Sequence, residues 1–284
     1  MVDATGLLII GANGQLGKAL QQQYPRAKAV DMGELDISDS QQLDDFDWSG
    51  IQTVFNAAAY TNVDGAETTE GRVIAWQANA AAPRNLARKC LENDMTLVHI
   101  SSDYVFDGSH KEHLEDEPFS PLSVYGASKA GGDIAVSELP KHYIVRTSWV
   151  IGDGKNFVRT MLELGKRGIE PSVVSDQIGR LTFTSELVKA IDHILQKRAE
   201  FGTYNISNNG ESVSWAEITR AIFTEAGLTN KVTDITTKDY YKNKEGVAPR
   251  PLQSTLDLSK IKKTGFITTD WRESLAKYLR NSAS

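Results

Sequence analysis

Short apolar runs alternate with amphipathic helical stretches through the first half of the chain, and this order leaves few folds open. Strands that alternate with helices build right-handed βαβ units, which form a parallel sheet with helices on both faces. Ligands of such sheets bind at the carboxyl ends of the strands. Strands are predicted at 7–10, 28–31, 53–56, 97–101 and 143–146, with helices at 15–23, at about 69–92 and around Tyr125.

The second half of the chain has a looser pattern, without a sharp change in composition. We predict a Rossmann-type, doubly wound parallel α/β domain over residues 1–150 and a smaller mixed α/β substrate-binding lobe over residues 151–284. Segments around 172–200 are expected to join the first domain. Helices are predicted at 156–166, 184–198, 215–226 and 271–281, with short strands near 172–174 and 203–206.

Composition limits the partners of the chain. A net charge of −6 over 284 residues argues against nucleic acid or an anionic membrane as the main partner, so an anionic ligand needs a local site. The single cysteine, Cys90, excludes an intrachain disulfide and suits a reducing cytoplasm. The start of the chain lacks a basic region, and the apolar run at 7–10 is too short to span a bilayer. A cytoplasmic protein is therefore expected.

The first predicted strand runs directly into a glycine-rich turn at 11–17 that opens a helix. Glycines permit the tight turn and let the backbone approach a pyrophosphate, whose charge the helix N-terminus favours. The G-x-x-G-x-x-G spacing is typical of short-chain dehydrogenases. Such turns also occur without a ligand, but the strand-turn-helix context favours a dinucleotide. The predicted cofactor contacts in this turn are Gly11, Asn13, Gly14, Gln15, Leu16 and Gly17.

Two aspartates follow the second predicted strand. Asp31 lies where a carboxylate can bond the adenosine ribose 2′-hydroxyl and repel a 2′-phosphate. Because the next residues supply no arginine, this charge favours NADH, or use of both cofactors, over a strict requirement for NADPH. Asp36 and Ile37 are predicted to flank the adenine. A loop cap is the alternative role for either aspartate.

Small residues end the third predicted strand. Ala57, Ala58 and Ala59 leave room for a dinucleotide, where bulky side chains would block its path. Close helix packing is the alternative explanation. Asn79, on the following helix, is predicted to belong to the cofactor site, where its amide would buttress the strand ends. A surface asparagine is equally compatible with the sequence.

Tyr125 and Lys129 are four residues apart, so the phenol and the ammonium share one face of a helix. A nearby cation lowers the pKa of a tyrosine below its usual value of about 10, which would let Tyr125 exchange a proton with a substrate oxygen. Ser102 closes the fourth strand and is expected to bond the substrate carbonyl, while Lys129 holds the nicotinamide ribose. An exposed helical pair and a simple serine turn are the structural alternatives.

No other chemistry competes in the sequence. His110 and His113 lie in an acidic loop, and the five histidines and one cysteine do not cluster, so no metal site is predicted. The chain has neither a G-x-S-x-G nucleophile elbow nor a P-loop.

Longer motifs resemble the dTDP-4-dehydrorhamnose reductase family, which belongs to the extended short-chain dehydrogenases/reductases. The most specific are D-Y-V-F-D-G at 103–108 and R-T-S-W-V at 146–150, which accompany the Tyr125/Lys129 pair. The resemblance covers almost the whole chain. Further matching segments are 11–17, 35–38, 56–67, 155–157, 176–179 and 250–254.

The resemblance implies reduction of the C4 ketone of dTDP-4-dehydro-β-L-rhamnose to dTDP-β-L-rhamnose, the last step in the synthesis of that sugar donor. The family usually takes NADPH and often tolerates NADH. Ser102, Tyr125 and Lys129 take the catalytic positions. Residues expected to line the cofactor and sugar site are Tyr60, Thr61, Val63, Ser102, Asp103, Tyr104 and Trp149, and Arg250 with Asn156 is expected at the substrate diphosphate.

The chain departs from the family pattern at a few positions. Ser102 stands where threonine is frequent and keeps the hydroxyl, whereas Leu181 replaces a usual proline and Ile151 an aromatic or similar residue. Some family members form a magnesium-linked dimer through a glutamate on the first helix. Ala19 stands at the matching position, so no metal bridge is expected and a monomer is predicted.

Two alternatives stay open. An epimerase, dehydratase or reductase of another nucleotide sugar would share the first half of the chain, and the motifs at 176–179 and 250–254 argue for the reductase. A non-catalytic regulatory subunit, similar to the β subunit of methionine adenosyltransferase, would keep the fold without turnover. The complete set of catalytic residues argues against it.

Overall fold

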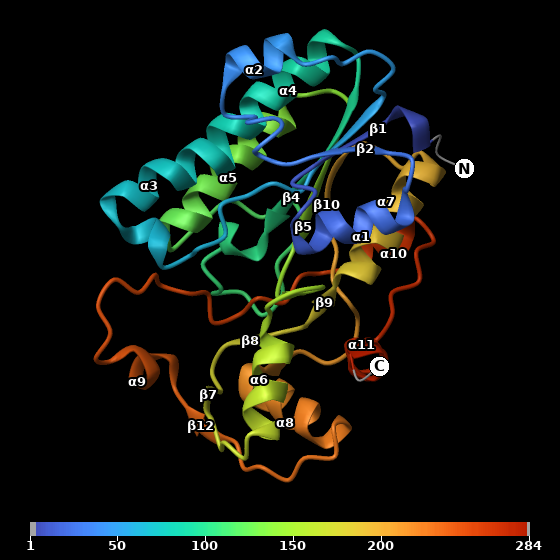
Figure 1. Ribbon diagram of the computed structural model, residues 1–284. Coiled ribbons are helices and arrows are strands. Elements are labelled where there is room, and N and C mark those ends of the chain that lie inside the picture. Colours follow the sequence, from blue (N-terminus) through green and yellow to red (C-terminus); the bar gives the residue numbers. More distant parts are fainter. Residues whose placement is uncertain (1–3, 283–284) are drawn as a thin grey trace.

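The computed structural model describes residues 4–282 and is built around a six-stranded sheet in the order β10-β5-β4-β3-β1-β2 (Figure 1). All pairings in this sheet are parallel, and the strand order changes direction between β1 and β3. That change marks the ligand-binding crevice of a doubly wound sheet. The strands are β1 (Leu7–Ile10), β2 (Lys28–Val30), β3 (Thr53–Asn56), β4 (Thr96–Ser102), β5 (His142–Thr147) and β10 (Gly202–Asn205).

Helices cover both faces of the sheet because its central strands are apolar on both sides. In β1, Leu7 and Ile9 belong to one core layer, whereas Leu8 and Ile10 belong to the other. One layer includes α1 (Gln15–Gln23), α7 (Thr184–Lys197) and α10 (Ser259–Lys263). The other includes α2 (Ser40–Asp45), α4 (Ala82–Glu92) and α5 (Val124–Ser137).

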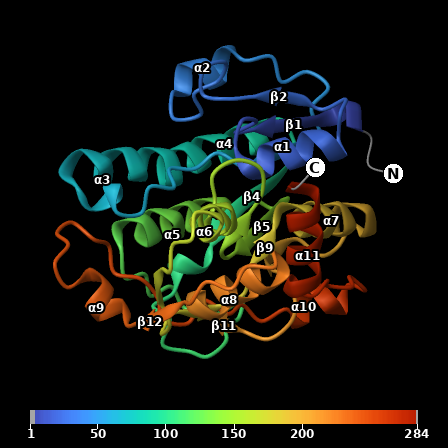
Figure 2. The ribbon, with the colours of Figure 1, turned by 60° about the horizontal axis from the view of Figure 1, so that its bottom comes forward.

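A second, smaller lobe lies below the sheet in Figure 1. Its core contains Trp271, Phe223 and Val158, and Figure 2 shows α8 beside α11 at this end of the molecule. Its strand pairs are β6 (Val150–Ile151) with β9 (Thr182–Phe183), β8 (Ile178–Gly179) with β11 (Val213–Ser214), and β7 (Ser172–Val174) with β12 (Thr233–Ile235). Its helices are α6 (Phe157–Lys166), α8 (Trp215–Glu225), α9 (Thr237–Tyr241) and α11 (Trp271–Ser282).

The predicted Rossmann-type α/β fold is confirmed, with one correction among the segments expected to cross between the lobes. Strand β10 extends the large sheet and α7 packs beside α1, so the chain returns to the first domain after 183. Strand β7, which was also expected to join the first domain, instead pairs with β12 in the smaller lobe. The boundary near residue 150 stays a prediction.

The helical stretch predicted at about 69–92 is interrupted in its middle. It consists of α3 (Thr69–Trp76), a π-helical turn (Gln77–Ala81) and α4. Three short 3₁₀ turns complete the elements, at Ala4–Gly6, Gly65–Glu67 and Asp103–Val105. Within the residues that the structure describes, no helix is long and apolar enough to cross a membrane.

Candidate active site

Three adjoining cavities run along the carboxyl ends of the strands and into the smaller lobe. The first, of about 520 Å³, and the second, of about 660 Å³, share Gly14, Ala57 and Ala59 in their walls. The second shares Tyr104 and Trp149 with a third cavity of about 250 Å³ between the lobes. The three volumes therefore form one continuous path from the glycine-rich turn to the smaller lobe.

The glycine-rich turn tolerates no side chain at its two ends. Gly11 has a φ of +79°, and a Cβ atom there would lie 2.6 Å from the backbone nitrogen of Ala58. A Cβ atom on Gly17 would lie 2.1 Å from the carbonyl oxygen of Gly11. Gly11 therefore lets the turn approach the segment that follows β3, and Gly17 lets α1 pack onto the turn. Gly14, between them, lines both cavities without a side chain.

Asp31 both caps the glycine-rich turn and lines the first cavity. Its Oδ2 atom accepts a hydrogen bond from the backbone N–H of Asn13 at 2.7 Å, and its Oδ1 atom accepts one from Met32 at 2.8 Å. The loop-cap role is therefore present, and the carboxylate still faces the cavity where a ribose would lie. Each carboxylate oxygen has a further lone pair for such a ligand.

The remaining residues predicted for the adenosine half also border the first cavity. The Asp36 carboxylate is held by the backbone N–H and the hydroxyl of Ser38, at 2.9 and 2.7 Å. Bordering the same cavity are Gly11, Ile37, Ala57, Ala58, Ala59 and Tyr60.

The proposed catalytic side chains meet in the second cavity, although they come from two different elements. Ser102 is the last residue of β4, and Tyr125 and Lys129 lie in the first turns of α5. Helix α5 begins there because the Ser123 side chain caps it, accepting a hydrogen bond from the N–H of Gly126 at 3.1 Å. Lining the second cavity are Asn13, Gly14, Gln15, Leu16, Ala57, Ala59, Thr61, Val63, Ser102, Asp103, Tyr104, Tyr125, Lys129 and Trp149.

The charge states of the pair differ from the sequence expectation. Burial raises the pKa of Tyr125 to about 12, and Ser102 opposes that rise in part. Burial lowers the pKa of Lys129 to about 8, and Asp133 opposes that fall. The Lys129 ammonium donates to the carbonyl oxygen of Ile100 at 2.6 Å. The expected lowering of the Tyr125 pKa by a neighbouring cation is therefore wrong for this structure, where burial dominates.

A buried charged cluster lies behind Lys129. Asp133 is 1% exposed, and its Oδ2 atom accepts from Nε of Arg146 at 3.0 Å. Its Oδ1 atom lies 3.9 Å from Nε2 of His99. The Asn56 amide donates to Nδ1 of His99 at 3.1 Å, which leaves the ring proton on Nε2, facing Asp133. Burial lowers the pKa of His99, so the ring is neutral and Asp133 is shared by Lys129 and Arg146.

The third cavity has an aromatic wall and one cation. Trp149 has a φ of +47°, unusual for a residue with a side chain, and its ring stacks on Trp215 with centroids 3.7 Å apart. Arg250 faces the same cavity and is held by Asp64, with a nitrogen–oxygen distance of 2.9 Å, and by the carbonyl oxygen of Ala248 at 2.7 Å.

Three predicted site residues line none of the three cavities: Gly17, Asn79 and Asn156. Gly17 packs against the Gly11 carbonyl, so it closes the turn from behind and does not line the cofactor path. Asn79 is fully buried and bonds the N–H of Tyr60 at 2.9 Å, its carbonyl at 3.0 Å and the Ser128 hydroxyl at 3.0 Å. The predicted buttress role of its amide is therefore present, but the side chain lies behind the cofactor path and does not line it. The Asn156 side chain caps α6 and bonds the Gly152 carbonyl at 2.8 Å, so its predicted contact with the substrate is also corrected.

Comparison with known proteins decides which family this arrangement belongs to. The family model described as "RmlD substrate binding domain" matches residues 5–284. The chain belongs to the RmlD family.

Its relatives are similar over nearly their whole length. The chain is 37% identical to dTDP-4-dehydrorhamnose reductase of Aggregatibacter actinomycetemcomitans, over 95% of this chain and 96% of the relative. It is 36% identical to the spore coat polysaccharide biosynthesis protein SpsK of Bacillus subtilis, over 99% of each. The crystal structure of dTDP-4-dehydrorhamnose reductase from Bacillus anthracis in complex with NADP superposes with a TM-score of 0.89, at 36% identity over 97% of this chain and 98% of that one.

Some residues of this RmlD-family site were missed by the sequence analysis. Thr147 and Ser148 lie in the R-T-S-W-V motif and line the second cavity, but only the tryptophan of that motif had been singled out. Gln177, within the matching segment 176–179, and Tyr241, from a segment without a motif, line the third cavity. Motifs were the available clue for Thr147, Ser148 and Gln177. The place of Tyr241 depends on how the lobes pack.

Buried hydroxyls support a polar ligand in the second cavity. The Thr147 and Ser148 oxygens are buried there without a hydrogen-bond partner among the described residues. Together with the side-chain-free approach at Gly11 and Gly14, they fit the ribose and amide groups of a nicotinamide dinucleotide. Within residues 4–282, no three histidine, cysteine, aspartate or glutamate side chains cluster as a metal site. Independence from metals stays a prediction.

Proposed function

We propose that the protein reduces the C4 ketone of dTDP-4-dehydro-β-L-rhamnose to dTDP-β-L-rhamnose with a nicotinamide cofactor. The observation that carries the proposal is the meeting of Ser102, Tyr125 and Lys129 between a dinucleotide-sized path and a cavity in the second lobe. Membership of the RmlD family and the names of the relatives at 37% and 36% identity support the same reaction.

Each catalytic side chain has a task that its surroundings suit. When bound, NADPH or NADH supplies the hydride that adds to C4. A pKa of about 12 keeps the Tyr125 hydroxyl protonated at neutral pH, so its proton is available for O4 as negative charge develops there. Ser102 bonds the same oxygen and polarises the carbonyl. Lys129, whose pKa is about 8, is mostly charged at neutral pH, so it adds positive potential beside Tyr125 and a contact to the nicotinamide ribose.

The third cavity suits the nucleotide part of the substrate. Its aromatic wall offers stacking surface, and the Arg250 fork suits two diphosphate oxygens. Arg250 is 14% exposed in its side chain, so it is accessible yet already oriented by Asp64.

NADPH is proposed as the cofactor, with NADH also accepted. The relative from Bacillus anthracis was solved with NADP, which favours the phosphorylated cofactor. The Asp31 carboxylate at the first cavity opposes a strict requirement for the 2′-phosphate. Initial rates with each cofactor decide between them.

A coupled assay with the authentic dTDP-4-dehydro sugar tests the proposal. The wild type should oxidise NADPH and form dTDP-rhamnose, and Tyr125→Phe should lower kcat by about 10²–10⁴-fold because the general acid is lost. Tyr143→Phe is the matched control, since Tyr143 is buried and donates to the Ala199 carbonyl away from the cavities. Turnover of another nucleotide sugar alone, or full activity of Tyr125→Phe, would contradict the proposal.

A monomeric, metal-independent enzyme of the cytoplasm is proposed alongside this activity. Ala19 at the position of the metal-binding glutamate supports the monomer. The absence of bulk positive charge supports a small-molecule partner rather than nucleic acid or a membrane surface. Light scattering with magnesium and with EDTA tests this, and a dimer that dissociates in EDTA would contradict it.

A further inference from the structure

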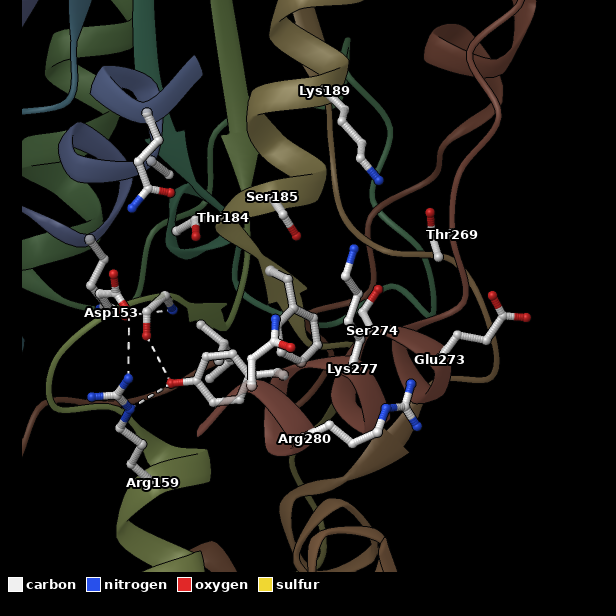
Figure 3. A pocket seen from close by; sticks show the side chains of 18 residues that line it. Asp153, Arg159, Thr184, Ser185, Lys189, Thr269, Glu273, Ser274, Lys277 and Arg280 are labelled. Carbon is white, nitrogen blue, oxygen red and sulfur yellow. Dashed lines mark hydrogen bonds and ion pairs between the residues drawn. The ribbon is translucent and has the colours of Figure 1, made fainter. Parts of the chain in front are cut away.

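A fourth cavity lies between α1, α7 and α11 (Figure 3), and it shares only Gln15 and Asp153 with the second cavity of the active-site path. Its volume is about 630 Å³, close to that of the second cavity of the active site. Four basic and two acidic side chains line it, so its lining carries a net charge of +2 in a protein of net charge −6. This local reversal of sign points to an anionic ligand.

The cations that matter are two lysines on different helices. Figure 3 shows the ends of Lys189, from α7, and Lys277, from α11, pointing toward one another across the cavity. Among the described residues, neither lysine has a hydrogen bond or ion pair, and Lys189 acts on Glu186 only through space. Glu186 is itself buried and accepts from the Thr269 N–H at 2.7 Å. Two converging ammonium groups repel each other, and a bound anion would relieve that repulsion.

The other two lining cations are already engaged. Arg159 donates to the Tyr278 hydroxyl at 2.8 Å and lies 3.4 Å from Asp153. Arg280 lies 3.9 Å from Glu225. The two lysines therefore remain as the charges available to a ligand.

The amino end of α7 adds to this positive potential. The helix is 14 residues long, and its N-cap Phe183 provides no side-chain cap, so its dipole favours an anion at this end. Thr184, the first helical residue, is only 8% exposed and faces the cavity in Figure 3. Its hydroxyl has no hydrogen-bond partner among the described residues, so a buried polar group is available to a ligand there.

We propose that this cavity binds a phosphate-bearing small molecule. Lys189 and Lys277 would hold the phosphate oxygens as point charges, and the Thr184 and Ser185 hydroxyls would donate to them. The cavity is larger than a phosphate group requires, which leaves room for an organic part. The proposal does not depend on the reaction proposed above.

Calorimetric titration with pyrophosphate tests the site. The enzyme is first saturated with NADP⁺ and dTDP, so that the active-site path cannot take up the probe. One equivalent of pyrophosphate should bind, the affinity should fall at least tenfold in the Lys189→Ala/Lys277→Ala double variant, and Thr184→Val should weaken it several-fold. Lys197→Ala is the matched control, because Lys197 is an exposed lysine at the far end of α7 and should leave the affinity unchanged.

The outcomes separate the possible occupants. Tighter binding of ATP than of pyrophosphate identifies a nucleotide-like ligand, and equal binding identifies the inorganic anion as sufficient. No binding to the wild type, or unchanged binding to the folded double variant, overturns the proposal. Light scattering compares the oligomeric state of the wild type with that of the Lys189→Ala/Lys277→Ala variant. A different oligomeric state with an unchanged affinity for pyrophosphate overturns the proposal in favour of an interface between copies of the chain.

Discussion

At the scale of single residues, the chemistry depends on charged groups that burial has moved from their behaviour in water. Lys129 is 2% exposed, and it keeps a pKa of about 8 because Asp133, one helical turn away, opposes the cost of burying its charge. Asp133 lines none of the three cavities of the path, so it is a positioning residue that acts through Lys129.

Replacing Asp133 by asparagine should move the alkaline limb of the pH profile. The variant keeps an oxygen for Arg146 but loses the charge that raises the Lys129 pKa, so Lys129 loses its proton at lower pH. We expect the limb of kcat/KM, near pH 8 in the wild type, to move down by about one unit. Initial rates from pH 6 to 10 measure it.

The control for that variant is Glu186→Gln, which removes another buried carboxylate outside the active-site path. It should lower stability without moving the limb. An unchanged limb in Asp133→Asn would show that Asp133 has only a structural role.

A second residue-scale prediction concerns cofactor preference. Asp31→Asn removes the charge that faces a 2′-phosphate, yet it keeps one oxygen for the turn that Asp31 caps. The ratio of kcat/KM for NADPH over NADH should rise about tenfold, which corresponds to ~1.4 kcal/mol.

Glu34→Gln serves as the matched control, because it removes a neighbouring charge that does not line the first cavity. A rise of similar size in this control would assign the effect to net charge. A constant ratio in Asp31→Asn would remove Asp31 from the specificity argument.

At the scale of elements, the π-helical turn between α3 and α4 has a specific purpose. A π turn shifts the side chains of a helix by one position, and such turns are frequent at functional sites. Here it includes Asn79, whose amide bonds both backbone groups of Tyr60, the residue that follows the alanine segment of the first cavity. The turn thus fixes the wall of the cofactor path from behind.

Asn79→Ala should therefore lower the free energy of unfolding by about 2–4 kcal/mol, because it leaves buried polar groups without partners. Asn93→Ala is the control, since Asn93 is exposed and donates a single bond to the Lys89 carbonyl at 2.9 Å. It should change stability by only about 0.5 kcal/mol. Urea unfolding measures both, and equal losses would refute the buttress role.

At the scale of the whole molecule, function requires the two lobes to meet. Arg250 belongs to a segment late in the chain, yet it is paired with Asp64 from the first half, at 2.9 Å. The backbone N–H of Ala248 also donates to Asp64, at 3.0 Å. This contact sets the cation of the third cavity at a fixed place relative to the catalytic edge of the sheet.

Arg250→Ala should raise KM for the dTDP-sugar by about 10–100-fold, since charge-assisted bonds to a diphosphate contribute about 1.5–3 kcal/mol. The KM for NADPH should stay unchanged, because Arg250 lines only the third cavity among those of the active-site path. Arg220→Ala, which breaks an exposed ion pair with Asp234 in the same lobe, controls for a loss of charge. Equal increases in both KM values would contradict this division of the path.

The sequence by itself determined the parallel sheet, the glycine-rich turn and the Ser102, Tyr125 and Lys129 set. Each depends on local properties: the period of apolar residues, the φ angle at Gly11, and the four-residue spacing on a helix. Family motifs added the residues of the second half, including Arg250.

The tertiary structure decided everything that depends on partners far along the chain. Only packing shows that Asn156 uses its amide to cap α6, that the Lys129 ammonium turns to Ile100, and that β10 completes the large sheet. Burial, which sets the pKa values of Tyr125 and Lys129, is likewise a property of the assembled molecule. A hydrogen bond or a buried charge is fixed by three-dimensional neighbours, and no local pattern in the sequence encodes them.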